Sequence, residues 1–336
     1  MKRNFPVKKR NAKILSVILL AILTRIPGVR GQHVLLEDVP DHKIDQTVFA
    51  TLPLDEEKRD GVEKAVKSRD YRRAEEILVE EVDHQPKSPA LLTFLGKVFF
   101  LDGKYLDCAI AMKKADLVTP LKDSDRITLA LSYLSLNHSD WARPELEMLT
   151  RSNPGNPVST YWLGRIDYDA LQYKAAAAKF QRVLELNPNF MKAYDNLGLT
   201  YEALGQYDDA ISTYTRSNQL NRKQAVPSPW PPLNLGTLLV KLEKFDEAEA
   251  SIRESLLYDS RFPKAHLQLG LVLEKQKKDE GALRELRQAI EYDPMDAEPH
   301  YVLGRIYQRR GDRQQADVEW ETFQKLKADQ PQVIPH

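Results

Sequence analysis

The chain has 336 residues, of which 29% are charged and 42% hydrophobic; this composition is typical of a folded protein and excludes disorder over most of the length. The formal net charge is zero, but residues 1–31 hold eight Lys or Arg and no acid, so the remainder is acidic by eight charges. An acidic body repels phosphate backbones, which argues against a nucleic-acid partner. The single cysteine, Cys108, excludes an intramolecular disulfide and a cysteine-rich metal site.

Residues 1–31 have the three-part layout of a secretory signal peptide. A basic stretch ends at Lys13, ten largely apolar residues follow at 14–23, and a short polar segment ends at Gly31. Ten residues are too few to span a bilayer, which takes about twenty. We therefore predict export to the periplasm or the extracellular space, with cleavage before Gln32. The alternative is that residues 14–23 remain as an uncleaved tether in the inner membrane, the only route by which this chain would meet a membrane.

Residues 32–54 form a lead-in to the rest of the chain. They contain Pro40, Pro53 and several charges, which favour a linker of low helical order. A strap that folds back on the groove is an equal alternative for this segment. Residues 331–336 are interpreted as a short tail.

A 34-residue period runs through the chain after the lead-in, and internal repeats of this length indicate a stacked-repeat architecture. The pair Leu-Gly recurs with its glycines at Gly96, Gly164, Gly198, Gly236, Gly270 and Gly304. A small residue follows twelve positions after each glycine, and a bulky residue follows sixteen positions after it. The spacings are 68, 34, 38, 34 and 34. The first equals two periods, with Leu129-Ala130 in the missing place, and the Pro-rich segment 226–232 absorbs the four extra residues of the third.

The period predicts eight repeats, each with two amphipathic helices. Their predicted bounds are 55–88, 89–122, 123–156, 157–190, 191–224, 229–262, 263–296 and 297–330. In the fifth repeat, Gly198 leaves room for the second helix and Tyr214 fills the gap beside it. A lone helix pair buries too little apolar surface, so the repeats must stack into a solenoid.

This pattern resembles the tetratricopeptide repeat family over residues 55–330, and the exported members of bacteria in particular. The resemblance implies an all-α fold, a right-handed α-solenoid of about eight helix-turn-helix repeats. It also implies a concave groove, lined by the first helices, that binds peptides or segments of other proteins. Two features of chaperone-binding members are missing, because Asp195 and Leu199 stand where a Lys and an Asn would complete a carboxylate clamp.

Helix periodicity assigns positions five, nine and twelve of each repeat to the hollow of the groove, with position two at its rim. The predicted partner-binding residues are Ile127, Leu131, Leu134, Tyr161, Tyr168, Leu199, Trp230, Leu233, Val240, Leu267, Leu271 and Tyr301. Many are apolar or aromatic, and an exposed apolar surface of this extent usually marks an interface. Packing between adjacent first helices is the alternative role for these side chains. Polar neighbours that would hold a peptide backbone are Asp195, Asn196, Asn234, Lys264 and Arg305.

The sequence contains no Gly-rich phosphate loop and no metal-protease motif, and it predicts no cofactor and no metal. His266 and His300 lie one period apart, but a third ligand is not evident, so we interpret both as packing residues. Cys108 occupies the small-residue column and is expected to be buried and inert.

We predict a non-enzymatic scaffold that binds other proteins or peptides in the cell envelope, with envelope assembly or secretion as the candidate setting. A membrane-anchored adaptor of the same fold is the first alternative. An accessory or substrate-binding subunit of an enzyme such as a glycosyltransferase is a remote one, since the repeats leave no room for a catalytic domain. Partner identity and oligomeric state are left open.

Overall fold

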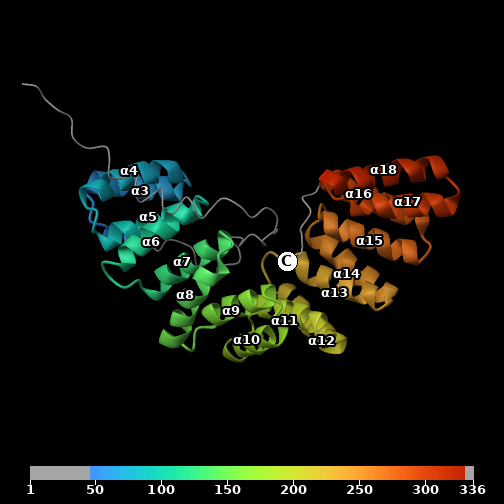
Figure 1. Cartoon of the computed structure of the whole chain (residues 1–336), viewed down its shortest axis with the longest axis horizontal. Coiled ribbons are helices and arrows are strands. Elements are labelled where there is room, and N and C mark those ends of the chain that lie inside the picture. Colours follow the sequence, from blue (N-terminus) through green and yellow to red (C-terminus); the bar gives the residue numbers. More distant parts are fainter. Residues whose placement is uncertain (1–45, 330–336) are drawn as a thin grey trace, which may run out of the picture.

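The computed structural model describes residues 46–329, and within this range the chain forms seventeen helices and no strand (Figure 1). After the short helix α2, the helices follow one another as eight antiparallel pairs, which we number one to eight from α3–α4 to α17–α18. The fold is an all-helical, right-handed α-solenoid. The predictions for residues 1–31, 32–45 and 330–336 lie outside the described range.

The bounds are α2 (Gln46–Ala50), α3 (Glu56–Lys67), α4 (Tyr71–His84), α5 (Pro89–Leu101), α6 (Tyr105–Asp116), α7 (Asp123–Ser135), α8 (Ser139–Ser152), α9 (Pro157–Asp169), α10 (Tyr173–Leu186), α11 (Met191–Ala203), α12 (Tyr207–Asn221), α13 (Trp230–Lys241), α14 (Phe245–Tyr258), α15 (Pro263–Lys275), α16 (Asp279–Tyr292), α17 (Glu298–Arg310) and α18 (Arg313–Asp329). No helix of the described range has the length and apolar character needed to cross a membrane.

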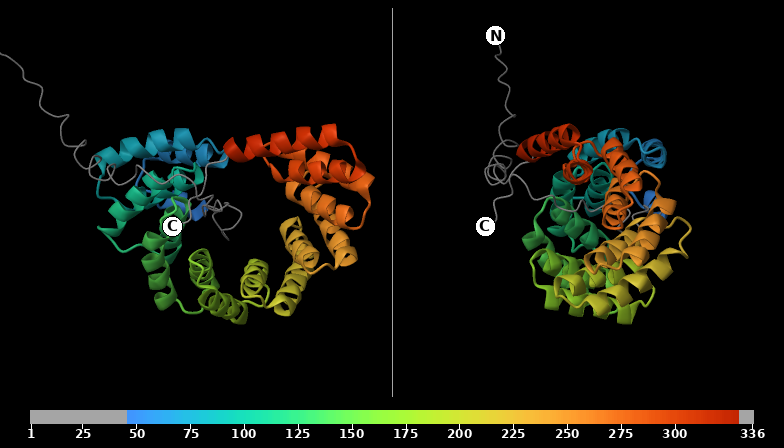
Figure 2. Two further views of the ribbon diagram at one scale, coloured as in Figure 1. Left: turned by 45° about the vertical axis from the view of Figure 1, so that its right-hand side comes forward. Right: turned by 90° about the vertical axis from the view of Figure 1, so that its right-hand side faces the viewer.

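The array curves strongly, so that the first and last pairs lie toward the same side of the molecule (Figure 2). From α5 onward, the first helices of successive pairs contact one another along most of the array, whereas the second helices mainly contact their own partner and the following first helix. The first helices therefore lie on the inside of the curve and the second helices on the outside.

The turn inside every helix pair contains one residue with positive φ. These residues are Arg69, Gly103, Asn137, Leu171, Gly205, Glu243, Lys277 and Gly311. They keep the 34-residue spacing, with one interval of 38, although only three of them are glycine. The backbone conformation thus repeats at this position, although the residue type varies. A left-handed residue is needed there to reverse the chain after the first helix.

The recurrent glycine lets the two helices of a pair approach closely. A Cβ placed on Gly198 would lie 2.5 Å from the ring of Tyr214, which is fully buried. The same relation links Gly164 with Phe180 and Gly304 with Trp320. The spacing of sixteen residues between glycine and bulky residue is therefore a packing contact, as predicted for the fifth repeat.

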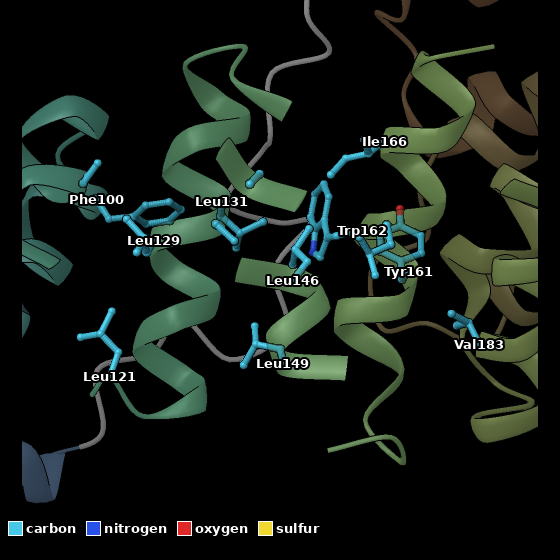
Figure 3. Packing of buried hydrophobic residues seen from close by; sticks show 14 of the residues in the cluster. Phe100, Leu121, Leu129, Leu131, Leu146, Leu149, Tyr161, Trp162, Ile166 and Val183 are labelled. Atoms are coloured by element: carbon cyan, nitrogen blue, oxygen red, sulfur yellow. The ribbon is translucent and has the colours of Figure 1, made fainter. Parts of the chain in front are cut away.

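The apolar core is continuous from α5 to α11 but changes character farther on. One cluster of buried side chains extends from Leu92 to Leu197, and Figure 3 shows part of it. A second cluster extends from Leu233 to Ala316. Between them lies a small cluster of Ala210, Tyr214 and Leu238.

The region between pairs five and six, which we call the joint, buries polar groups. Ser217, Asn218 and Asn221 of α12 are buried, as is Ser255 of α14. The Asn221 side chain holds the segment before α13 by two hydrogen bonds of 2.8 Å: it accepts from the N–H of Ser228 and donates to the C=O of Ser228. Two hydrogen bonds from one buried side chain thus hold the segment that carries the four extra residues.

Helix α2 and the residues after it pack on the first pairs. Phe49 lies edge-on to Phe94 of α5, with ring centroids 5.3 Å apart, and Leu52 and Leu54 are buried in the same cluster. Residues 46–50 are therefore helical, unlike the low helical order expected for the lead-in. The described end of the lead-in packs on the first pairs.

Candidate partner-binding groove

The first helices α5, α7, α9, α11, α13, α15 and α17 line the concave side, and all twelve predicted groove residues lie on six of them. Eight of these residues reach the surface at least in part: Ile127, Leu134, Tyr168, Leu199, Trp230, Val240, Leu271 and Tyr301. The other four are buried: Leu131, Tyr161, Leu233 and Leu267. The partly exposed residues, with Trp230 and Tyr301 the most open, define the accessible part of the groove.

The buried members belong to the contacts between neighbouring pairs. Tyr161 is 1% exposed, and its ring lies 5.4 Å from that of Trp162 and 5.1 Å from that of Phe190. Leu131 and Trp162 lie between α7 and α9 (Figure 3). Because the inner helices pack directly on one another, side chains at position five face a neighbouring helix in several repeats. These four residues therefore stabilise the array and do not offer surface to a partner.

Polar groups on the concave side form links from one inner helix to the next. Lys97 pairs with Asp125 at 2.5 Å between α5 and α7. Asn196 donates to the hydroxyl of Tyr161 at 3.2 Å between α9 and α11.

Two further links continue this series toward the C-terminus. Asn234 donates to Asp195 at 2.9 Å between α11 and α13. Arg305 donates to both carboxylate oxygens of Glu274, at 3.0 and 2.5 Å, between α15 and α17. Of the five polar neighbours predicted from sequence, four thus serve these inter-helix links.

Asp195 lies between α11 and α13, at the joint. Burial raises the pKa of its carboxyl to about 6, against the opposing effects of the hydrogen bond from Asn234 and the charge of Arg165. One carboxylate oxygen accepts from Asn234, while the other, Oδ1, is buried with no hydrogen-bond partner among the described residues. A buried acceptor without a donor is costly, so the charged form of Asp195 weakens the joint.

Trp230 forms the rim of the groove beside the Pro-rich segment. Its side chain is 41% exposed, and its ring lies 4.9 Å from the ring of Phe262, edge-on. The Lys264 Nζ lies 4.8 Å from the same ring, in a cation–π contact. An aromatic side chain held in place but still open to solvent is well suited to contact a partner.

A cavity of about 700 Å³ lies where α2 meets the inner helices of pairs two and three. Its walls include Val48 and Leu52 beside α5 residues Thr93 and Lys97, with Asp125 of α7 opposite. The sequence interpretation omitted this end of the groove because positions five and nine of the second repeat are polar. Thr93 and Lys97 occupy positions five and nine of their repeat, the positions that selected the other residues. Position in the repeat therefore predicts the lining of this cavity, whereas hydrophobicity does not.

The remaining candidates for chemistry are engaged in structural contacts. His266 pairs with Glu285 at 2.7 Å and His300 with Glu319 at 2.6 Å, so each histidine is bound within its own helix pair. In residues 46–329 no three potential metal ligands come together. Cys108 is buried, and burial raises the pKa of its thiol to about 12, which keeps it protonated.

Helical pairs stacked with their first helices inward define the class of this protein, a helical-repeat solenoid. Comparison with family models identifies the repeat type. Residues 179–212 and 233–286 match models described as tetratricopeptide repeats, and residues 275–311 match one described as a TPR repeat. Three segments of the chain thus match models of tetratricopeptide repeats, in agreement with the helical-repeat architecture.

This chain spans less than a fifth of the length of the curated relatives that it matches. A CTR9 homolog of Arabidopsis thaliana is 25% identical over 178 residues, which are 50% of this chain but only 16% of that protein. The crystal structure of a tetratricopeptide repeat protein from Parabacteroides merdae superimposes with a TM-score of 0.60 at 18% identity, covering 82% of this chain and 99% of the other. The Cut9–Hcn1 hetero-tetramer gives a TM-score of 0.60 at 18% identity, covering 73% of this chain and 48% of that chain. At these identities the structural likeness concerns the fold.

Proposed function

We propose that this chain is a non-enzymatic scaffold that binds extended segments of other proteins along its concave surface. The observation that carries the proposal is the set of apolar and aromatic side chains that remain accessible on the inner helices although their neighbours are buried there. Tyr168, Leu199, Val240 and Leu271 are partly exposed, and Trp230 is the most open of the aromatic residues near the joint. Burial of such a surface by a partner lowers the free energy of the system and favours binding.

The fold supports the same function, since proteins built from these repeats mediate protein–protein interaction. One of the similar structures, for example, is that of the Cut9–Hcn1 hetero-tetramer. Several polar side chains of the inner helices are engaged in the links described above. These links connect one inner helix to the next. A preformed curve lowers the ordering cost of binding, because the partner alone must become ordered.

We further propose that the scaffold acts after export, in the cell envelope, with envelope assembly or secretion as its setting. The support is the layout of residues 1–31, with their eight basic residues and apolar run at 14–23. A retained tether at 14–23 is the second form of this proposal. N-terminal sequencing of the protein purified from its host separates the two, because cleavage leaves a new N-terminus and a tether leaves the original one.

The groove is tested by crosslinking and affinity capture from cell-envelope extract with the full chain as bait. A groove variant carries Tyr168→Ala, Leu199→Ala and Leu271→Ala, which truncate accessible side chains. We expect the wild type to enrich a small set of proteins and the groove variant to lose them. Tyr161 is left intact, because it is buried and its loss would perturb folding.

A matched control variant carries Val79→Ala, Leu117→Ala and Leu257→Ala, three exposed apolar residues that lie outside the inner helices. This control should capture the same proteins as the wild type, and circular dichroism should show equal helicity for all three baits. Equal capture by the groove variant would place binding elsewhere on the molecule. Capture of no specific protein by any bait would overturn the scaffold proposal.

A further inference from the structure

His266, at the start of α15, has an acceptor on each ring nitrogen. Its Nδ1 lies 2.7 Å from a carboxylate oxygen of Glu285 in α16, and its Nε2 lies 3.0 Å from the carbonyl oxygen of Ser260 in the preceding turn. The side chain is buried, at 8% exposure for the residue. The turn between α14 and α15 is thus fastened to α16 through one imidazole ring.

Two acceptors require two N–H donors, and only the protonated imidazolium has both. In the neutral ring one nitrogen would point a lone pair at an oxygen, so one hydrogen bond is lost and replaced by repulsion. Burial by itself lowers the pKa of His266, but the hydrogen bonds to Glu285 and Ser260 and the charges of Glu285 and Asp259 outweigh it and raise the pKa above 6.5. The geometry and the electrostatics agree on a charged ring.

The fastened turn carries part of the groove rim. Two residues after Ser260, Phe262 packs edge-on against Trp230 at 4.9 Å. Arg261, in the same turn, lies over the ring of Tyr292, which in turn lies 5.5 Å from the ring of His266. The position of Ser260 therefore affects how Phe262 supports Trp230.

We propose that His266 is a proton-operated fastener that holds the Phe262–Trp230 rim in place in acid and releases it as the pH rises. The charged and titratable groups that face it are Glu285 and Tyr292 of α16, with Asp259 and Arg261 of the turn. The role of the rim as a partner contact rests on the proposed function. The fastener itself does not, because it is a property of the free protein.

The sign of the effect follows from the direction of the pKa change. A group whose pKa is raised on folding stabilises the folded state fully below its unfolded value, near 6.5, and loses that contribution as the pH passes its folded value. The seventh pair and its preceding turn are therefore firmer at pH 6 than at pH 8.5. A protein in an acidified compartment would hold its rim more rigidly than one in alkaline surroundings.

The next pair supplies an internal comparison. His300 occupies the same position one period later and pairs with Glu319 through Nδ1 at 2.6 Å. Pro294 stands at the place of Ser260, and within residues 46–329 no acceptor lies on the Nε2 of His300. A single N–H therefore satisfies this contact, and His300 is a matched control for the two-acceptor arrangement.

The first experiment follows the full chain by NMR between pH 5 and 9. Long-range ¹H–¹⁵N spectra of the histidine rings report the protonation of His266, assigned with His266→Gln. Fluorotryptophan labelling with ¹⁹F detection reports the rim, with Trp230→Phe identifying its resonance. We expect His266 to titrate above pH 6.5 and the Trp230 resonance to shift with the same midpoint. Titration of His266 below pH 6.5 would overturn the proposal, and an unshifted Trp230 would overturn the link to the rim.

Thermal unfolding supplies an independent check. The melting temperature of the wild type should exceed that of His266→Gln by a few degrees at pH 6 and by less at pH 8.5. Glu285→Gln, which keeps an oxygen acceptor without the charge, should lower the midpoint of the Trp230 shift. His300→Gln should leave the midpoint of the Trp230 shift unchanged. A difference between wild type and His266→Gln that is equal at both pH values would contradict the proposal, and none of these outcomes depends on a partner.

Discussion

The pairs from α5 to α10 and the joint between pairs five and six solve the same stacking problem with different chemistry. In the former, large apolar side chains such as Trp162 and Phe180 fill the interface and form one continuous cluster. In the joint, Asn221, Ser217 and one carboxylate oxygen of Asp195 are buried, and hydrogen bonds link α12 to the segment before α13 and α11 to α13. Hydrogen bonds are directional. The joint therefore depends on the placement of a few polar groups, whereas the pairs from α5 to α10 share one continuous apolar cluster.

The largest effect that separates the two regions is expected for Phe180→Ala. This side chain is fully buried in the continuous cluster and packs against Gly164 and the ring of Tyr161. Its loss leaves a cavity and should lower the free energy of unfolding by about 3–5 kcal/mol. Chemical denaturation followed by circular dichroism measures the loss. A loss below about 1 kcal/mol would show that the cluster does not supply cohesion.

A smaller and more local effect is expected for Asn221→Ala at the joint. Two hydrogen bonds to the backbone of Ser228 are removed, at about 1 kcal/mol each. Hydrogen exchange should become faster in residues 222–229 and in α13 but stay unchanged from α5 to α10. Asn187→Ala is the matched control, because Asn187 occupies the same repeat position and makes one local hydrogen bond, to the N–H of Asn189. Equal effects of the two substitutions would remove the distinction between joint and array.

The smallest effect is expected for Asp195→Asn, and it is stabilising. The folded pKa of Asp195, about 6, is raised above its ordinary value of 3.8, so the stability linked to the protonated form is lost as the pH rises between these values. An amide mimics the protonated group at every pH. The variant should gain about 1–2 kcal/mol over the wild type at pH 7 and nothing at pH 3.5, measured by denaturation at both values. A gain that does not depend on pH would contradict this account of the joint.

The fold was predictable from sequence because its determinants are local and periodic. Gly198, Ala210 and Tyr214 lie within one helix pair, and their spacing alone fixes which helix faces meet. The 38-residue interval indicated the position of the joint, because four extra residues interrupt the regular 34-residue repeat there. The polar chemistry of the joint was not predicted, because Asn221 bonds to a segment that has no counterpart in the other repeats.

The accessible part of the groove was less predictable. A helical wheel assigns Leu131, Tyr161, Leu233 and Leu267 to the hollow side of their helices, but the structure buries all four. For Tyr161 the cover includes Phe190, just before the next inner helix, and the periodicity of one helix does not contain that contact. His266 was interpreted as a packing residue for the same reason. The sequence held a signal for its true partner, since a Glu follows nineteen residues after both His266 and His300.

The eight turns with a left-handed residue offer sites where substitution should raise the stability of the protein. Arg69, Leu171, Glu243 and Lys277 adopt a conformation that costs an ordinary side chain roughly 1 kcal/mol and costs glycine nothing of the kind. Natural selection has put glycine in three of the eight equivalent turns. Substitution of glycine for the residue in the other turns should give an array of higher stability. These sites lie outside the groove.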